Sequence, residues 1–139
     1  PVIGDTVYYR EMKKYVESQH HRGRPYIGEY LDEKNGAWLM GDRERSRYYN
    51  HSTFADLVIT GLVGIRPQAE KKVVVHPLVP AGQWKYFCLD AVPYQGHLLT
   101  VLWDEDGQRY HQGTGMVLLV DGNKVATRST LGELTYQLP

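Results

Sequence analysis

Cysteine is nearly absent from this sequence of 139 residues, and its scarcity excludes two classes of structure. A single cysteine, Cys88, allows neither an internal disulfide framework nor a zinc site built on cysteine ligands. Because Cys88 stands in a strand-like run between Phe87 and Leu89, its thiol is predicted to be buried and unreactive.

Long apolar runs and an excess of charge of either sign are also missing. No apolar run approaches the roughly 20 residues that cross a bilayer, so we expect no membrane-spanning segment. Sixteen basic and sixteen acidic residues cancel, and this balance argues against a general nucleic-acid binder, which relies on surplus Lys and Arg. Hydrophobic residues at 42% and charged residues at 23% instead indicate a globular protein.

The sequence begins at Pro1, without an initiating methionine, and its first residues do not form a signal peptide. A start this close to a helix suggests a piece of a longer precursor, whose earlier part could carry a signal. Phenylalanine is scarce as well, with two residues against eleven tyrosines and three tryptophans. Amphipathic rings suit polar sites such as sugar pockets, although they also serve well in strands.

The first helix is predicted over about residues 5–19, with Asp5 or Thr6 as its cap. Gly23 follows its basic end. One face of this helix should carry its apolar residues, because they recur at spacings of three and four. These residues are Val7, Tyr8, Met12, Tyr15 and Val16.

A second helix is predicted from a cap at Asn50, Ser52 or Thr53 through about Leu62. Apolar residues cover most of its circumference, and a helix that is apolar all round is a buried helix. We therefore expect this helix to be buried in the protein, with Pro67 beyond its end.

From residue 72 onward the pattern changes to short strands rich in β-branched and aromatic residues. The expected strands are 72–76, 84–92, 97–103, 116–120 and 124–130. The segments 104–107 and 121–123 have the composition of hairpin turns. Five or six strands at this spacing predict an antiparallel sandwich or roll, and the fold class is therefore α+β.

Three histidines and two acidic residues of the β part are candidate metal ligands by residue type. The group lacks a His-x-His pair or other ligand spacing, so we expect no metal site and no cofactor. Its members are His76, His97, His111, Asp104 and Glu105.

Between the two helices, residues 27–33 place three carboxylates near aromatic side chains on an irregular segment. Such loops often carry catalytic groups, and hydrolysis of a glycosidic bond by inversion needs a carboxylic acid and a carboxylate about 6.5–9.5 Å apart. Glu29 has no charged neighbour in the sequence and is the best placed of the three. Asp32 and Glu33 lie in a turn, where acidic residues are ordinary, and for Glu29 itself the alternative is a solvated loop carboxylate.

Residues 48–51 form a second candidate group. In a functional interpretation Tyr48, Tyr49 and His51 face a polar pocket, where the rings stack on sugars and the imidazole donates hydrogen bonds. In the structural interpretation, which the residues alone favour, Asn50 is a helix cap and His51 lies in the first turn. The preceding arginines are expected in a solvated or ion-paired loop: Arg43, Arg45 and Arg47.

The order of these features carries a family resemblance. The glutamate loop is followed by Tyr-Tyr-Asn-His-Ser-Thr, then by an apolar helix ending in Gly-Leu-Val-Gly-Ile-Arg-Pro, then by strands with Val-His-Pro-Leu-Val-Pro. This arrangement resembles the carboxyl-terminal end of bacterial glycoside hydrolases with an (α/α)6 barrel, of the mannosylglycerate-hydrolase-like group related to processing α-glucosidase I. It implies a two-helix remnant of the barrel in residues 1–66 and an antiparallel β-sandwich in residues 67–139.

The resemblance also implies roles for individual residues. The family's general base lies on a loop resembling Trp-Glu-Asn-Tyr-Asp followed by Thr-Gly, and here Gly-Glu-Tyr-Leu-Asp followed by Asn-Gly is similar, which assigns the base to Glu29. Because glycine replaces the tryptophan and the tyrosine is out of step, Glu33 is the alternative. Tyr30, Tyr49 and His51 are implied to bind substrate. Nothing in the sequence matches the family's general acid, which is expected outside it.

The implied function is therefore an inverting glycoside hydrolase acting on a carbohydrate, with a periplasmic or secreted location. Since one helical hairpin cannot close a barrel, these residues alone are expected to be inactive. The flank of the helices is expected to bind the rest of the parent chain or another copy. The alternative is a non-catalytic module, whose sandwich binds carbohydrate through Trp84, Tyr94 and Trp103 or only supports the barrel.

Overall fold

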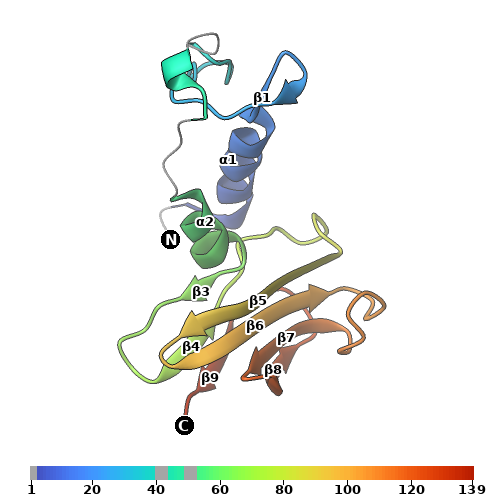
Figure 1. Ribbon diagram of the computed structural model, residues 1–139. Coiled ribbons are helices and arrows are strands. Elements are labelled where there is room, and N and C mark those ends of the chain that lie inside the picture. The colour runs from blue at the N-terminus through green and yellow to red at the C-terminus, as the bar shows by residue number, and fades with distance from the viewer. Residues whose placement is uncertain (1–2, 40–43, 49–52) are drawn as a thin grey trace.

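A helical part stands on a β-sandwich, and an irregular tip lies at the far end of the first helix (Figure 1). The computed structural model describes residues 3–39, 44–48 and 53–139. Over these residues the fold class is α+β with antiparallel sheets, which confirms the prediction.

The N-cap of helix α1 (Asp5–Ser18) lies one residue before Asp5, the first of the two expected caps. Gly4 is its N-cap and provides no side-chain hydrogen bond, while the carboxylate of Asp5 accepts from the backbone N–H of Thr6 at 2.7 Å. The predicted apolar face is correct only at its centre, because Met12 is buried whereas Val7 and Val16 are exposed.

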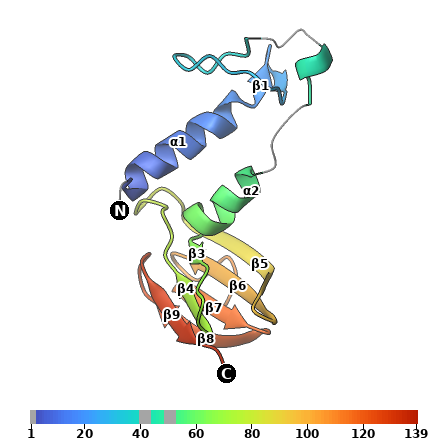
Figure 2. The same ribbon diagram turned by 90° about the vertical axis from the view of Figure 1, so that its left-hand side faces the viewer.

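Helix α2 (Phe54–Leu57) continues directly into a π-helical turn, η2 (Val58–Leu62), as Figure 2 shows from the side. The π geometry is visible in the hydrogen bond from the Val63 N–H to the Val58 carbonyl oxygen at 2.9 Å. The expected helix exists, but the prediction that all of it is buried is wrong: Leu57 is 44% exposed, and only the end that meets the sandwich is covered.

A close joint fixes both helices to the sandwich. The Tyr8 hydroxyl on α1 donates to the Leu57 carbonyl oxygen at 2.8 Å and lies directly against Gly61 of η2, where a β-carbon would overlap it. Partial burial raises the pKa of Tyr8, so its phenol remains a donor at neutral pH. Next along α1, the ring of Tyr9 packs edge-on against Trp84 with centroids 5.9 Å apart.

The sandwich consists of two antiparallel sheets. One has the order β3-β4-β9 and the other the order β5-β6-β7-β8. Their bounds are β3 (Ile65–Arg66), β4 (Lys72–Val75), β9 (Leu134–Gln137), β5 (Tyr86–Tyr94), β6 (His97–Asp104), β7 (Gly115–Val120) and β8 (Asn123–Arg128). All five predicted strands are confirmed with ends shifted by two residues or fewer, whereas β3 and β9 were not predicted.

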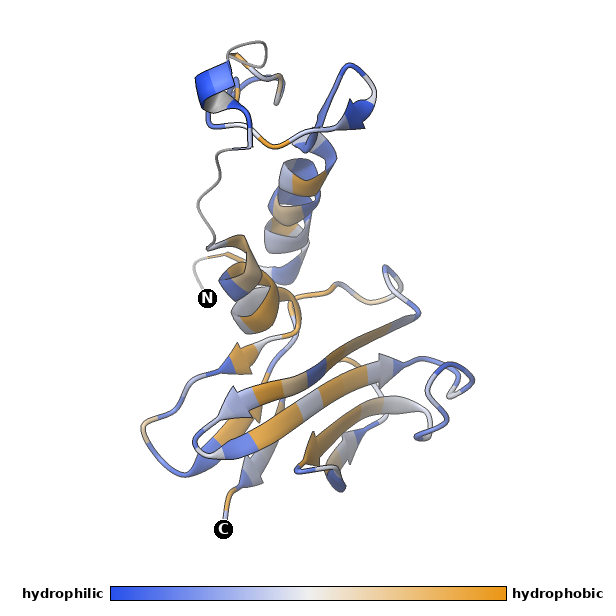
Figure 3. Ribbon diagram, viewed as in Figure 1, coloured by the Kyte–Doolittle hydropathy of each residue, from blue (hydrophilic) through white to orange (hydrophobic). Residues whose placement is uncertain are grey.

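The main hydrophobic core lies between these sheets and under η2, where Figure 3 shows the apolar strands. Residues from both sheets are completely buried there, so the sandwich has a core of its own. They include Val73, Val75, Leu99, Val101, Met116 and Leu118.

The two predicted hairpin turns have different outcomes. Asp121 and Gly122 form the expected two-residue turn, with φ of 51° and 79°, between the paired residues Val120 and Asn123. The segment 104–107 is not a tight hairpin, because Asp104 pairs with Gly115 across a longer loop. Asp104 is buried, and its carboxylate accepts the backbone N–H groups of residues 107, 109 and 110 at 3.1, 2.9 and 2.7 Å.

Cys88 was predicted to be buried, and this prediction is wrong. The thiol is exposed on β5, because Phe87 is the residue of this pair that points into the core. Partial desolvation and the negative charge of Asp90 raise the pKa of the thiol, so Cys88 is mainly protonated at neutral pH and a weak nucleophile.

Candidate functional site

The segment that carries the predicted catalytic residues forms the tip of the molecule. It follows a small hairpin, β1 (His20–His21) and β2 (Arg24–Pro25), whose two-residue turn has φ of 53° at Arg22 and 73° at Gly23. Next to it lies the short helix η1 (Glu44–Ser46). Neither was predicted, because each depends on only two or three residues with no apolar pattern.

An aromatic cluster holds the tip in place. Tyr26 is buried and meets Trp38 with ring centroids 5.2 Å apart, and the indole N–H of Trp38 donates to the His20 carbonyl oxygen at 3.1 Å. Gly28 lies on these rings so closely that a β-carbon there would be 2.7 Å from Tyr26 and 2.9 Å from Trp38. Glycine is therefore required beside Glu29 for steric reasons.

Glu29 is exposed at the rim of a groove of about 560 Å³ between α1, α2 and the tip. Aromatic side chains contributed by three different segments line this groove, among them Tyr15, Trp38 and Phe54. Two of these rings, Tyr15 and Phe54, stack on each other with centroids 5.0 Å apart. The carboxylate of Glu29 thus reaches solvent at the mouth of an open, aromatic-walled cleft.

The other acidic residues of the tip are placed differently. Asp32 accepts the backbone N–H of Lys34 at 2.8 Å and so closes its own turn. Glu33 is exposed on that turn and does not line the groove. Of the two candidates for the base, Glu29 is the one beside the cleft.

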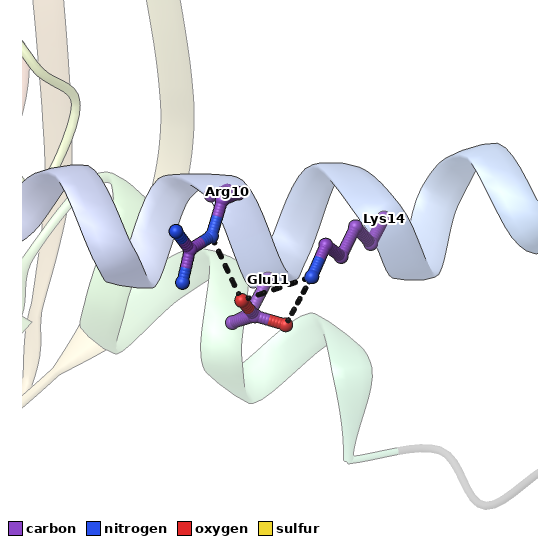
Figure 4. Close-up of polar contacts among 3 residues, drawn as sticks. All are labelled: Arg10, Glu11 and Lys14. Atoms are coloured by element: carbon purple, nitrogen blue, oxygen red, sulfur yellow. Dashed lines mark hydrogen bonds and ion pairs between the residues drawn. The ribbon is translucent and has the colours of Figure 1, made fainter. Parts of the chain in front are cut away.

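A further carboxylate, Glu11 of α1, also lines the groove but is tied to basic neighbours (Figure 4). It accepts hydrogen bonds from Arg10 at 3.0 Å and from Lys14 at 3.3 Å. These bonds lower the pKa of Glu11. A general acid needs a raised pKa to hold its proton, so Glu11 is unsuited to that role.

The predicted substrate-binding residues are only partly described. Tyr30 is half-exposed beside Glu29, while Tyr49 and His51 lie outside the described residues. Their neighbour Tyr48 has φ of 62°, and its backbone N–H donates to the Ile27 carbonyl oxygen at 2.7 Å.

A second cavity, of about 590 Å³, opens on the other side of Tyr26. The hairpin and residues 47–48 line it with three arginines and a histidine. The sequence does not reveal this cavity, because Arg22 and Arg24 follow the first predicted helix and Arg47 belongs to a loop that we expect to be solvated or ion-paired. Its lining residues are His21, Arg22, Arg24, Pro25, Tyr26, Arg47 and Tyr48.

The side chains suggested for sugar binding on the sandwich are used within the fold. Trp103 is buried, and its indole N–H donates to the Trp84 carbonyl oxygen at 2.9 Å. The Tyr94 hydroxyl donates to the Lys72 carbonyl oxygen and accepts from the Gln68 N–H. Trp84 and Tyr94 are only partly exposed.

Among the described residues, no group of three or more His, Cys, Asp and Glu side chains is arranged to hold a metal ion. His97 instead contacts Asp121 at 2.7 Å between Nδ1 and Oδ2, and His76 lies 3.7 Å from Glu133. Within the same residues, no helix combines the length and the hydropathy needed to cross a bilayer.

Two family models match the chain. The model described as mannosylglycerate hydrolase MGH1-like glycoside hydrolase domain matches residues 2–52, and the model described as glycosyl hydrolase family 65, C-terminal domain, matches residues 65–127. The first match contains Glu29 and the second contains most of the sandwich.

A solved structure named "Sialidase" is also similar to this chain. The two are 58% identical, with a TM-score of 0.90 over 97% of the chain. The chain spans 12% of the length of that protein, so the similarity concerns a small part of a much larger molecule.

Proposed function

Since this chain carries glycoside hydrolase domain sequence in residues 2–52 and 65–127, which confirms the resemblance, we propose that it supplies the general base of an inverting glycosidase. The base is Glu29. The general acid comes from another part of the same enzyme, and the division between the helical and β parts falls at residue 66.

The position of Glu29 is the observation that carries this proposal. Its carboxylate is exposed at the mouth of an aromatic-walled groove, and the contact of Gly28 with Tyr26 and Trp38 fixes the backbone beside it. A base that activates water must reach solvent and stay in register with the sugar. Glu33 is not held in register with a sugar in the groove, because it lies on an exposed turn that does not line the groove.

The chemistry assigned to Glu29 is removal of one proton. As the base takes a proton from a water molecule, the water oxygen bonds to the anomeric carbon and the glycosidic bond breaks. A carboxylic acid about 6.5–9.5 Å away protonates the departing oxygen. Glu11 does not fit this second role, because Arg10 and Lys14 lower its pKa.

The first test is Glu29→Gln in the full-length enzyme, with Glu33→Gln as the matched control. Loss of general base catalysis is expected to lower kcat by roughly 10²–10⁴-fold, with folding unchanged, whereas the control should keep near-normal activity. NMR of the first sugar released should show the inverted anomer. Activity that survives Glu29→Gln, or that is lost only in Glu33→Gln, would overturn the assignment.

A second test separates the base from general structural damage. Azide attacks without needing a base, so it should restore turnover of Glu29→Ala on an activated aryl glycoside and give a glycosyl azide of inverted configuration. The substrate panel should include a terminal sialoside, because sialic acid is what the name of the 58% identical protein points to. Rescue without inversion would contradict the mechanism.

We also propose that another part of the enzyme packs against the exposed apolar surface beside the groove. Leu57 and Val7 leave apolar surface open along the helices, and the rest of the parent chain is its expected occupant, with a second copy as the alternative. Sedimentation of the full-length enzyme and of this chain alone tests this. If this chain alone self-associates and the full-length enzyme does not, the rest of the parent chain is the occupant.

A further inference from the structure

We propose that the basic cavity at the tip binds the carboxylate of an acidic carbohydrate, so that the substrate carries a negative charge near the bond that is cut. This inference rests on the proposed function, because it assigns a substrate class to the same tip. Two observations support it: the charge of the residues that line the cavity, and the contact of one of them, Tyr26, with Gly28 beside Glu29.

The lining gives the cavity one sign of charge. Three guanidinium groups and an imidazole border it, and no acidic side chain among the described residues does. Clefts lined by one sign of charge concentrate ions of the opposite sign. Guanidinium groups match the planar, two-oxygen geometry of a carboxylate through paired hydrogen bonds.

The hairpin is built to present these charges together. The turn at Arg22 and Gly23 has positive φ at both residues, which places Arg24 opposite His21 across the ladder. From the other side, Arg47 pairs its backbone with Gly28, and its guanidinium lies 5.3 Å from the centre of the Tyr48 ring. Two segments separated by more than twenty residues thus converge on one cavity.

A buried polar atom supports a ligand in this place. Tyr26 is only 8% exposed and lines the cavity, and its hydroxyl is buried without a hydrogen-bond partner among the described residues. A buried donor without a partner costs about 1–3 kcal/mol in the general case. An anion in the cavity would supply an acceptor for it.

The cavity lies next to the segment that carries Glu29. Tyr26 and Glu29 are three residues apart, so their Cα atoms are at most about 11 Å from each other. The Tyr26 ring also contacts Gly28, which stands immediately before Glu29. At about 590 Å³ the cavity falls in the range of about 300–1,000 Å³ typical of small-molecule sites.

The experiment compares acidic and neutral sugars in the full-length enzyme. Binding of glucuronate, N-acetylneuraminate, glucose and inorganic phosphate is measured by calorimetry at low and high salt. At least one of the acidic sugars should bind more tightly than glucose and phosphate, with affinity that falls as salt rises. Equal binding of acidic and neutral sugars would overturn the proposal, and so would tighter binding of phosphate than of either acid.

The deciding variants are Arg24→Gln and Tyr26→Phe, with Arg109→Gln on the sandwich as the matched control. Arg24 is exposed, and the Tyr26 hydroxyl has no partner to lose, so both variants should fold. Arg24→Gln should weaken acidic-sugar binding by roughly 10–100-fold, the worth of a charged hydrogen bond, and leave glucose binding unchanged. Tyr26→Phe should weaken it less. No change in Arg24→Gln would reject the site.

Glu29→Gln distinguishes failure of this inference from failure of the proposed function. If the cavity binds the acid group, Glu29→Gln keeps acidic-sugar affinity whether or not it abolishes turnover. Loss of turnover in Glu29→Gln together with unaltered binding in Arg24→Gln would uphold the base and reject the cavity.

Discussion

The tip and the sandwich of this chain are built in opposite ways. Between the two sheets, residues such as Leu99 and Leu118 are completely buried, whereas in the described residues before α2 only Met12 and Tyr26 are buried. The groove and the basic cavity both lie in that weakly packed region. Stability and chemistry are therefore separated along the chain, as expected when functional groups lie on segments carried by a rigid scaffold.

The sharpest test of this comparison removes one buried side chain from each region. Leu118→Ala should lower the free energy of unfolding by about 2–5 kcal/mol, because it opens a cavity in a closed core. Met12→Ala should cost less than that, since Met12 already borders the open groove. Urea unfolding of the chain measures both, and equal losses would contradict the comparison.

Asp104→Ala tests whether the sandwich depends on polar as well as apolar burial. The variant leaves three backbone N–H groups without their acceptor, and we expect a loss of about 2–3 kcal/mol with faster hydrogen exchange at Arg109 and Tyr110. Asp106→Ala is the matched control, because Asp106 is exposed and accepts a local hydrogen bond from the Gln108 N–H. A similar loss in both variants would show that the burial of Asp104 is unimportant.

Gly61→Ala tests the joint between the two regions. The added methyl group overlaps Tyr8, and overpacking of this kind costs typically 1–3 kcal/mol. In the double variant with Tyr8→Ala the overlap disappears, so the two losses should not add. Thermal unfolding of the four proteins gives the coupling energy, and simple additivity would show that Tyr8 and Gly61 act independently.

The smallest effect is expected at the exposed His97–Asp121 pair. The hydrogen bond from His97, and then that from the Leu98 N–H, lower the pKa of Asp121. The contribution to stability is therefore present above the ordinary aspartate pKa of about 3.9 and is lost as the pH falls through the lowered value. Melting temperatures of the wild type and Asp121→Asn should differ at pH 6 and converge in acid. A constant difference at all pH values would exclude this linkage.

The sequence predicted those parts of the fold that repeat over several residues. Strands such as Met116–Val120 are continuous β-branched or aliphatic runs, so their pattern is visible without their partners. Strands β3 and β9 were missed because each is short and pairs with β4, in the case of β9 across about sixty residues of chain. The burial of α2 was overestimated because apolar character does not reveal whether a covering element is present.

For the candidate site, local sequence was informative about Glu29 and uninformative about the basic cavity. Glu29 stands out because it is flanked by uncharged residues on an irregular segment, and in the structure it lines the groove. The cavity was missed because Arg24 and Arg47 are distant in the sequence and meet only through the turn at Gly23 and the pairing of Gly28 with Arg47.

The joint at Tyr8 and Gly61 makes α1 a lever arm. Ten residues of the helix separate Tyr8 from its last residue, Ser18, and at 1.5 Å per residue this arm is about 15 Å long, so a tilt of about 5° at the joint moves its end by about 1.3 Å. Catalytic groups must be held to within about 0.5 Å. The Tyr15–Phe54 stack is a second contact along this arm, and the tilt that it still allows is transmitted to Glu29.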